Sequence, residues 1–441
     1  MPDIQEIIRL MKDLEDQLVS CMRCGMCQAV CPLYAQTGRE ADVARGKLAL
    51  LDGLLKEMLD NPAEVSERLN KCLLCGSCAA NCPSGVHVLE IFLKARAILT
   101  GALGLSPAKR LVLKGLLAHP RLLDRTAEWA ARFQGIFTRP VNETVGTSCA
   151  RFASPLLSGR HFRTLAADPF HRDTPAMDTE PSGSGGKVAF FVGCLIDKIF
   201  PDVAKAVVEV LQYHDAGILI PEGQGCCGIP ALSAGETETF KQLLEHNLKL
   251  LENRSFDTLV TACATCTATI KELWPVMAAD VAPHLQAAAA QISEKTMDIH
   301  QYLVRRAGLK RLPEGSREPA RTVTYHDPCH LKKSLKVVDE PRQVLRAAGN
   351  GRLVEMPNGD ACCGMGGSFN LLYYDISAGI GRLKRDSIVA TGCSVVATGC
   401  PACMMQISDV LSRNGDHIAV RHPVQIYAEA MKNHESATQT G

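Results

Sequence analysis

The stretch PEGQGCCGIP, residues 221–230, places two cysteines side by side, and PNGDACCGMGG at 357–367 does so again. Neighbouring cysteines rarely form a disulfide with each other, because that bond would strain the peptide unit between them. Two thiolates on one tight turn indicate instead a site that needs several sulfurs at once. The glycine after each doublet, Gly228 or Gly364, favours such a turn because glycine adopts backbone conformations closed to other residues.

Each doublet lies inside a longer repeat. KVAFFVGC, ending at Cys194, matches TVTYHDPC, ending at Cys329, and DTLVTACATC at 257–266 matches CSVVATGCPAC at 393–403. Each copy reads as strand and cysteine, helix, strand, doublet turn, helix, strand and CxxC. The strand segments are continuous apolar runs rather than alternating ones, which predicts parallel strands covered on both faces and hence two α/β units.

Five cysteines of each repeat lie where a strand ends or a turn begins, and ligand sites of open α/β sheets gather at the carboxyl ends of strands. The two sets are Cys194, Cys226, Cys227, Cys263 and Cys266, and Cys329, Cys362, Cys363, Cys400 and Cys403. Five thiolates are one too many for a cubane cluster or a tetrahedral zinc ion. They therefore predict a cluster of unusual shape, or a cubane with a free redox thiol, and zinc stays as an alternative. Cys149 and Cys393 have no counterpart in the repeat and read as free cysteines.

The N-terminal segment contains a second duplicated motif. CMRCGMCQAVCP at 21–32 and CLLCGSCAANCP at 72–83 both follow C-x2-C-x2-C-x3-C-P, the bacterial ferredoxin pattern for [4Fe-4S] clusters, in which the fourth cysteine serves the other cluster. We therefore predict two [4Fe-4S] clusters, one held by Cys21, Cys24, Cys27 and Cys82 and the other by Cys72, Cys75, Cys78 and Cys31.

Composition restricts the function. The 441 residues carry a net charge of +1, which does not suggest a nucleic-acid-binding protein, and they include 20 cysteines. The N-terminus MPDIQEIIRLMKDLEDQ lacks a signal-peptide core, so we expect a cytoplasmic chain whose clustered cysteines serve metal or redox chemistry. The charge-free stretch 387–408 contains glycine, proline and cysteine, and it reads as a buried strand and a ligand loop rather than as a membrane span.

A connector separates the two duplications. Its part 105–137 is basic and amphipathic, with Lys109, Arg110, Lys114, Arg121, Arg125 and Arg132 beside Leu111, Leu113, Leu116, Leu117 and Leu122. Such a helix packs on its own protein or on a partner subunit, or it binds a membrane surface, here the inner face of the cytoplasmic membrane. The connector ends in DTEPSGSGGK, which predicts a flexible boundary.

These motifs predict an α+β protein in five parts: a helical ferredoxin-like domain with both [4Fe-4S] motifs at 1–100, a helical connector and flexible linker at 101–186, α/β repeats at 187–310 and 320–430, and a disordered tail at 431–441.

The spacing of each five-cysteine set resembles the cysteine-rich CCG domain of heterodisulfide reductases and of the iron–sulfur subunits of glycolate oxidase and of lactate and glycerol-3-phosphate dehydrogenases. The order of the whole chain most resembles the glycolate oxidase iron–sulfur subunit family. The resemblance implies noncubane [4Fe-4S] clusters at one or both five-cysteine sets.

The sequence contains no flavin or nicotinamide fingerprint, and no independent substrate site or catalytic residue is evident in it. The resemblance therefore implies an electron-transfer subunit of a flavin-linked 2-hydroxy-acid dehydrogenase, with FAD on a partner subunit. Electrons from glycolate or D-lactate would pass to a quinone or another carrier. The alternatives are a heterodisulfide reductase-like subunit whose doublet cysteines act on a disulfide, and a zinc-stabilised scaffold.

Three polar residues surround Cys329 in the segment YHDPCHLKK. His326, Asp327 and His330 are candidates for hydrogen bonds to cluster sulfur, or they are ordinary loop residues.

Overall fold

The computed structural model describes residues 4–152, 157, 159–183, 186–313, 321–349 and 351–439. The chain forms two compact units. The first, called the helical unit below, comprises Met1–Ala118, Gly228–Gln242 and Cys362–Gly381. The second, called the sheet unit, comprises His119–Cys227, Leu243–Ala361 and Arg382–Gly441.

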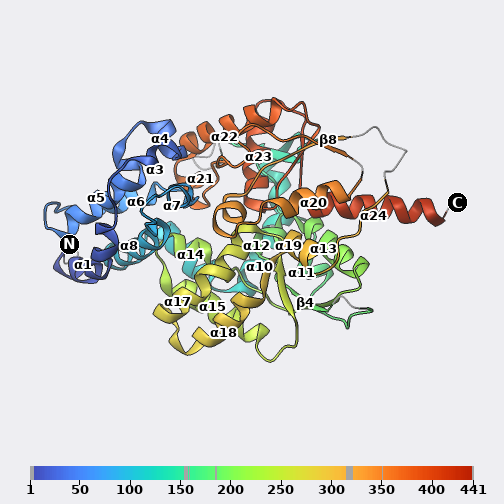
Figure 1. The fold of residues 1–441 in the computed structure, drawn as a ribbon, viewed down its shortest axis with the longest axis horizontal. Coiled ribbons are helices and arrows are strands. Elements are labelled where there is room, and N and C mark those ends of the chain that lie inside the picture. The colour runs from blue at the N-terminus through green and yellow to red at the C-terminus, as the bar shows by residue number, and fades with distance from the viewer. Residues whose placement is uncertain are drawn as a thin grey trace. The chain divides into compact units, whose positions relative to one another are not determined.

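The N-terminal part of the helical unit is built from helices drawn in blue to cyan in Figure 1. They are α1 (Ile4–Met11), η1 (Lys12–Leu14), α2 (Glu15–Val19), α3 (Met26–Ala29), α4 (Pro32–Thr37), η2 (Glu40–Asp42), α5 (Ala44–Leu55), α6 (Pro62–Asn70), α7 (Ser77–Ala80), α8 (Val88–Leu103), α9 (Pro107–Arg110) and η3 (Leu111–Leu117). Ile7, Met11, Leu14 and Leu18 are spaced by three or four residues, so they share one helical face, and all four are buried. Cysteines of both ferredoxin motifs pack against the core that this face joins.

Two segments that follow the cysteine doublets also belong to the helical unit. They are α14 (Ile229–Ser233) with the start of α15 (Thr237–Leu251), and α21 (Ser368–Leu372) with the start of α22 (Tyr374–Val389). Arg96 of α8 donates a 2.7 Å hydrogen bond to the Ser233 carbonyl, and Thr100 donates a 3.0 Å bond to the Ala234 carbonyl. The domain boundaries predicted from the sequence place these two segments in the α/β repeats, so they differ from the observed division.

The first repeat forms a five-stranded sheet in the order β3-β5-β4-β6-β7. Its strands are β3 (Met177–Asp178), β4 (Lys187–Phe190), β5 (Gly217–Ile220), β6 (Thr258–Thr261) and β7 (Thr296–Asp298). The strands β4 to β7 pair in parallel, as their apolar runs predict, and only β3 is antiparallel.

The second repeat forms a four-stranded parallel sheet in the order β11-β10-β8-β9. Its strands are β8 (Arg321–Tyr325), β9 (Gly351–Leu353), β10 (Val395–Ala397) and β11 (Ala419–Arg421). The strands β9, β8, β10 and β11 of this sheet lie in the same order as β5, β4, β6 and β7 of the first sheet. The sequence repeat is therefore also a repeat of topology. The predicted α+β class, with a helical ferredoxin-like part and two α/β repeats, is confirmed.

The remaining helices of the sheet unit lie before, between and after these strands in the chain, and Figure 1 labels several of them. They are α10 (Pro120–Phe137), α11 (Phe170–Asp173), α12 (Cys194–Lys198), α13 (Pro201–Tyr213), α16 (Ala264–Ala268), η4 (Thr269–Leu273), α17 (Trp274–Val281), η5 (Pro283–Leu285), α18 (Gln286–Lys295), α19 (Ile299–Arg305), η6 (His330–Ser334), α20 (Asp339–Ala347), α23 (Pro401–Arg413) and α24 (Pro423–Gln439).

Two predictions about irregular segments need correction. The connector, expected to end as a flexible linker, contains an antiparallel hairpin of β1 (Thr138–Asn142) and β2 (Thr147–Ala150), and its strand β3 joins the first sheet. Residues 184 and 185 of the Gly-rich boundary lie outside the described residues. The tail, expected to be disordered from residue 431, continues α24 as helix to Gln439.

Within the described part of the chain, no helix is both long enough and apolar enough to cross a membrane. The charge-free stretch 387–408 contains β10 and the first half of α23, as a buried strand and ligand loop predict.

Candidate metal-binding cysteine sites

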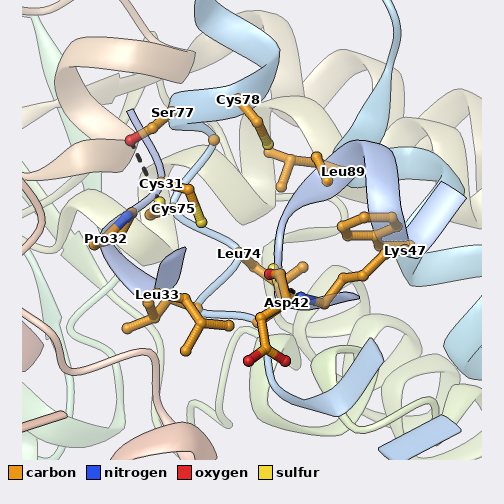
Figure 2. A pocket seen from close by; sticks show the side chains of 15 residues that line it. Cys31, Pro32, Leu33, Asp42, Lys47, Leu74, Cys75, Ser77, Cys78 and Leu89 are labelled. Carbon is orange, nitrogen blue, oxygen red and sulfur yellow. Dashed lines mark hydrogen bonds between the residues drawn. The ribbon is translucent and has the colours of Figure 1, made fainter. Parts of the chain in front are cut away.

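One cavity of the helical unit is lined by cysteines of both ferredoxin motifs. Cys72, Cys75 and Cys78 of the second motif share it with Cys31 of the first, as Figure 2 shows for three of the four side chains. Cys31 precedes Pro32, the first residue of α4, so the chain turns out of the first motif at this position. The four thiols are the set that the crossed ferredoxin pattern predicts for one cluster.

A second cavity collects the complementary set. Cys21, Cys24 and Cys27 line it together with Cys82 of the second motif. Cys78 lines both cavities, so the two sites are neighbours within the helical unit.

The rim of this second cavity faces solvent. Cys24 is exposed, and the flanking Met22 and Met26 are 67% and 52% exposed. Flexible thioether side chains adapt to a partner surface, so this rim is suited to a protein contact.

The electrostatics around the Cys31 cavity favour an anionic occupant. Burial raises the pKa of Cys31 to about 11, with Cys72 and Cys75 adding to the rise, so the metal-free thiol stays protonated. Two buried cations lie nearby: Lys47, 1% exposed, bonds the Asp42 carbonyl, and Arg96, 4% exposed, donates to the Cys72 carbonyl at 3.1 Å. A cluster with four thiolate ligands is a net anion, so four sulfurs beside two buried cations fit such a group.

We expect Arg96→Met to make the reduction potential at this site more negative. One unit charge removed at an effective dielectric of about 20 is worth about 2 kcal/mol, which for one electron is on the order of 90 mV. The variant also leaves the carbonyls of Leu69, Cys72 and Ser233 without their donor, at a cost of about 3 kcal/mol of stability. Redox titration followed by EPR measures the potential. Lys94→Met, which removes a partly exposed charge paired with Glu90 on the same helix, is the control and should shift the potential little.

Cys362, of the second five-cysteine set, packs beside the Cys31 site. Leu33, Leu73, Cys362, Phe369 and Ile380 form one buried apolar cluster of the helical unit, and Cys31 and Cys75 pack against it. The doublet turn is tight here because Gly364 has φ of +96°, and a Cβ atom would lie 2.6 Å from the Ser377 carbonyl oxygen. The turn thus brings a doublet cysteine close to a predicted ferredoxin-type site.

In the first repeat the five cysteines form one continuous row of sulfurs. Cys194 Sγ lies 3.7 Å from Cys226 Sγ, and hydrogen-bond contacts continue from Cys226 to Cys227, from Cys227 to Cys266 and from Cys266 to Cys263. The contacts with Cys227 and Cys263, together with burial, raise the pKa of the Cys266 thiol well above its ordinary value. A metal centre would replace these protons, and five contiguous sulfurs fit a multi-iron cluster better than a single zinc ion.

The backbone of the first doublet is held by buried side chains. Asn247 accepts a 3.0 Å hydrogen bond from the Gly225 amide and donates a 2.9 Å bond to the Cys226 carbonyl. Trp274 Nε1 donates to the Cys227 carbonyl at 3.0 Å. Neither residue has a recognisable motif, so the sequence did not point to them.

The two five-cysteine sets meet at equivalent positions. Cys263 and Cys400, each the first cysteine of its CxxC, are in hydrogen-bond contact, and Cys400 also contacts Cys403. The Ala264 amide donates a 3.1 Å bond to the Gly399 carbonyl, which holds the two loops together. The row of sulfurs therefore runs from Cys194 through Cys263 and Cys400 to Cys403.

The second set is divided between the two compact units. Cys329, Cys400 and Cys403 belong to the sheet unit, and Cys362 and Cys363 belong to the helical unit. Cys329 directly precedes η6, and Cys400 precedes α23, so both follow the carboxyl ends of parallel strands, as the sequence predicted.

The three polar residues around Cys329 differ in role. Asp327 is tied to Arg342 by bonds of 2.7 and 2.9 Å, so it serves an ion pair. His330 Nδ1 lies 3.1 Å from Thr265 Oγ1, which lies 3.6 Å from Cys400 Sγ, so Thr265 connects His330 to that sulfur.

His326 is buried, and its Nδ1 lies 3.1 Å from the Gly359 carbonyl, so Nδ1 carries the proton. One ring nitrogen of His326 lies within 4.8 Å of Cys403 Sγ, and the buried Nε2 then presents a lone pair. Burial lowers the pKa of His326 to about 3, so the ring is neutral, and Nε2 is suited to accept a thiol proton or bind a metal rather than to donate to sulfur.

The sequence missed a cavity of about 270 Å³ beside the first set, at the carboxyl ends of β4 and β5. Cys194 and Cys226 line it, and the connector supplies another wall through α10 and His171. His171 Nδ1 lies 2.9 Å from Asp197, and its Nε2 lies 3.0 Å from Glu128. No motif marks His171, because its partners lie 26 and 43 residues away in the sequence.

The pKa of His171 is raised above its ordinary value, chiefly by the Asp197 carboxylate and also by Glu128. A histidine with a raised folded-state pKa stabilises the fold fully below its unfolded pKa of about 6.5, and that stability is lost as pH rises through the folded-state pKa. We therefore expect the difference in apparent Tm between the wild type and His171→Gln to be largest near pH 6 and to vanish in alkali. Calorimetric scans at one fixed rate measure it, and a difference independent of pH would show that the imidazole is neutral. Exposed His284, changed to Gln, is the control.

The leucines of the amphipathic connector segment differ in exposure. Leu113 is buried, whereas Leu111 and Leu122 are 66% and 44% exposed. The sequence missed the largest exposed apolar side chains of α10, which are Trp129, Phe133, Ile136 and Phe137.

The two cysteines without a counterpart in the repeat, Cys149 and Cys393, lie outside the row of sulfurs described above. Cys149 accepts a 3.3 Å hydrogen bond from Arg139 Nε, and buried Cys393 donates to the Ile388 carbonyl. Both contacts suit free thiols, as predicted.

Comparison with known families gives the class of protein. A 4Fe-4S dicluster domain matches residues 17–86, and a cysteine-rich domain matches residues 188–271 and again 323–408. The chain is therefore an iron–sulfur protein with a ferredoxin-type dicluster domain and a duplicated cysteine-rich CCG domain.

The chain belongs to the family of the glycolate oxidase iron–sulfur subunit and lactate utilization protein A. It is 29% identical to a probable glycolate oxidase iron–sulfur subunit of Bacillus subtilis, over 91% of this chain and 90% of that protein. It is 31% identical to lactate utilization protein A of Shouchella clausii, over 54% of this chain and 97% of that protein.

Two further matches extend the comparison. One subunit of the CoM/CoB fumarate reductase of Methanothermobacter marburgensis is 32% identical over 61% of this chain and 52% of that protein. A crystal structure of a hypothetical protein from Helicobacter pylori shares the fold, with a TM-score of 0.50 and 11% identity over 97% of this chain and 76% of that one.

Proposed function

We propose that this chain is the electron-transfer subunit of a flavin-linked 2-hydroxy-acid dehydrogenase that converts glycolate to glyoxylate, D-lactate to pyruvate, or both. A partner subunit carries FAD and oxidises the acid, and a quinone or another carrier accepts the electrons. The observation that carries the proposal is the series of cysteine sites, which starts at an exposed rim and continues into the interior of each unit. The names of the relatives supply the substrate class.

Electrons enter at the site of Cys21, Cys24, Cys27 and Cys82. Its exposed Cys24, between Met22 and Met26, gives the flavin-bearing partner close access to this site. Cys78 borders both ferredoxin-type sites and so links the first to the second.

From the second ferredoxin-type site the route leads to the CCG domains. Within the helical unit, Cys362 shares an apolar cluster with Cys31 and Cys75, so one cysteine of the second five-cysteine set lies beside the Cys31 site. In the sheet unit, the contact between Cys400 and Cys263 then joins the second set to the first.

Two [4Fe-4S] clusters at the ferredoxin motifs, and noncubane clusters at the five-cysteine sets, would supply one-electron carriers along this route. The chain's own residues hold the thiolates, exclude water and compensate charge through Lys47 and Arg96. These are the means by which proteins set cluster potentials.

The test is anaerobic purification of the tagged chain from its own host, followed by flavin fluorescence and dye reduction with glycolate and with each lactate enantiomer. Co-purified flavin and activity with one acid would support the proposal and name the substrate. A brown, flavin-free protein that is inert to all three acids would overturn it.

A second candidate is reduction of a disulfide at the doublet cysteines. The match over 61% of the chain to a subunit of a fumarate reductase named for CoM and CoB supports a role in thiol chemistry, of which disulfide reduction is one reaction. Turnover of a thiol-cofactor disulfide by the brown, flavin-free protein, with loss of that turnover in Cys227→Ala, would support this alternative.

A further inference from the structure

The cavity beside Cys194 and Cys226 has the size of a small molecule, about 270 Å³. We call it the connector cavity, since Pro120, Leu123 and Asp124 of α10 form one wall. Exposed Arg121, Pro175 and Glu222 stand among its lining residues, so the cavity is open to solvent on that side. Cys226 is buried, so a ligand in the cavity lies between solvent and the end of the row of sulfurs.

One wall of the connector cavity carries a chain of charged and polar contacts. Lys198 Nζ lies 2.7 Å from Asp124 and 2.6 Å from Asp197, and His171 bridges Asp197 and Glu128. A metal ion is a poor candidate here, because the ammonium group already occupies the position between the two aspartates.

The charge balance of this network disfavours an anionic ligand. In the wall, the carboxylates of Asp124 and Asp197 face Lys198 and His171, Glu128 adds a third carboxylate on the other nitrogen of His171, and at the rim Arg121 and Glu222 offset each other. A hydroxy acid or a carboxylated disulfide would find no excess positive charge. A neutral molecule meets no such penalty.

Most of the rest of the lining is apolar, apart from Thr174 and Gln224. Leu123, Phe170, Val192 and Ile220 line the cavity together with three prolines. An apolar ring that carries polar oxygens matches a cavity with one apolar side and one charged, proton-bearing side.

We propose that the connector cavity binds a quinone ring and is the place where this chain delivers its electrons. The inference rests on the proposed function, which supplies the electrons from oxidation of the hydroxy acid. Two electrons, arriving one at a time at the Cys194 end, and two protons convert the quinone into the quinol, so that each carbonyl oxygen becomes a hydroxyl group.

His171 and Lys198 are the proton-holding groups of the cavity wall. Each donates a proton toward a reduced quinone oxygen, directly or through water, and is reprotonated from solvent at the open side. The groups that face His171 are Asp197 and Lys198 of α12 and Glu128 and Asp124 of α10, while Arg172 and Asp173 adjoin it on α11.

The first experiment fills the cavity. In the complex with its flavin subunit, Leu123→Trp should lower kcat/KM for ubiquinone-1 about tenfold or more, because an indole takes the place of the ring. Leu122→Trp on the exposed side of the same helix is the matched control and should leave that value unchanged. Pro175→Trp at the rim gives a second blocked variant if Leu123→Trp does not fold, as judged by iron content and circular dichroism.

The second experiment separates proton delivery from binding. His171→Gln should lower kcat for ubiquinone-1 by on the order of tenfold with little change in KM, since general acids contribute factors of this size or larger. The wild-type rate should fall as pH rises through the raised pKa of His171, and the variant should lose this dependence. Reduction of ferricyanide by the acid, which needs no proton, should be unaffected.

Photolabelling measures quinone binding in the absence of turnover. A photoactivatable azido analogue of ubiquinone should label peptides of α10 and of 170–175 in the full chain, and excess ubiquinone-1 or Leu123→Trp should abolish the label. Labelling elsewhere, or equal ubiquinone-1 rates in Leu123→Trp and Leu122→Trp, would overturn the inference. Failure of the wild-type complex to reduce ferricyanide with any acid would instead overturn the proposed function, while the labelling result would still decide whether the cavity binds a quinone.

Discussion

Cys82→Ala is expected to remove the cluster of the first ferredoxin motif and to leave that of the second. Cys82 lines the cavity of Cys21, Cys24 and Cys27, not that of its own motif. Loss of the fourth thiolate opens a cluster to solvent and oxidation, so about four irons should be lost and electron transfer from the acid should fall on the order of 100-fold or more. The partner subunit would then face an empty first site.

Alkylation under anaerobic conditions, followed by mass spectrometry, reads which site was lost. In Cys82→Ala, the cysteines at 21, 24 and 27 should become reactive, while those at 31, 72, 75 and 78 should stay protected. Cys31→Ala is the mirror variant and should give the reverse pattern. Cys149→Ala, outside both cavities, should change neither iron content nor protection. Reactive cysteines at 72, 75 and 78 in Cys82→Ala would show that each motif binds its own cluster.

Cys400→Ala should interrupt the route between the two CCG domains. Cys400 contacts Cys263 at the point where the sulfurs of the two repeats meet. We expect the hydroxy-acid substrate to reduce the ferredoxin-type clusters and bleach their absorbance as in the wild type. Reduction of ubiquinone-1 should fall on the order of 100-fold, because a carrier or its ligand is missing from the series.

Stopped-flow absorbance of the complex measures both events in one trace. The matched control is Cys393→Ala, which removes another buried thiol of the same repeat, one that donates to the Ile388 carbonyl. It should cost about 1 kcal/mol of stability and leave both rates intact. Unchanged ubiquinone-1 reduction in Cys400→Ala would place the exit of electrons before the first five-cysteine set.

Much of the candidate site was predictable because its signals are local. The ferredoxin spacing places three thiolates on one turn and sends the fourth away, and Pro32 and Pro83 mark the turn. Apolar strand runs predicted parallel sheets, and ligand positions at the strand ends follow from that topology. These features depend on covalent spacing and backbone conformation over a few residues, so the amino-acid sequence contains them.

The sequence by itself therefore determined the two ferredoxin-type motifs, the duplicated α/β repeat and the cysteines that serve them. Only the tertiary structure decided that Cys263 meets Cys400, that Cys362 packs beside Cys31, and that His171 closes a cavity next to Cys194. Each of these contacts joins residues far apart along the chain. Such contacts arise when apolar faces are buried against one another, and periodicity within a segment says which face is buried but not what it meets.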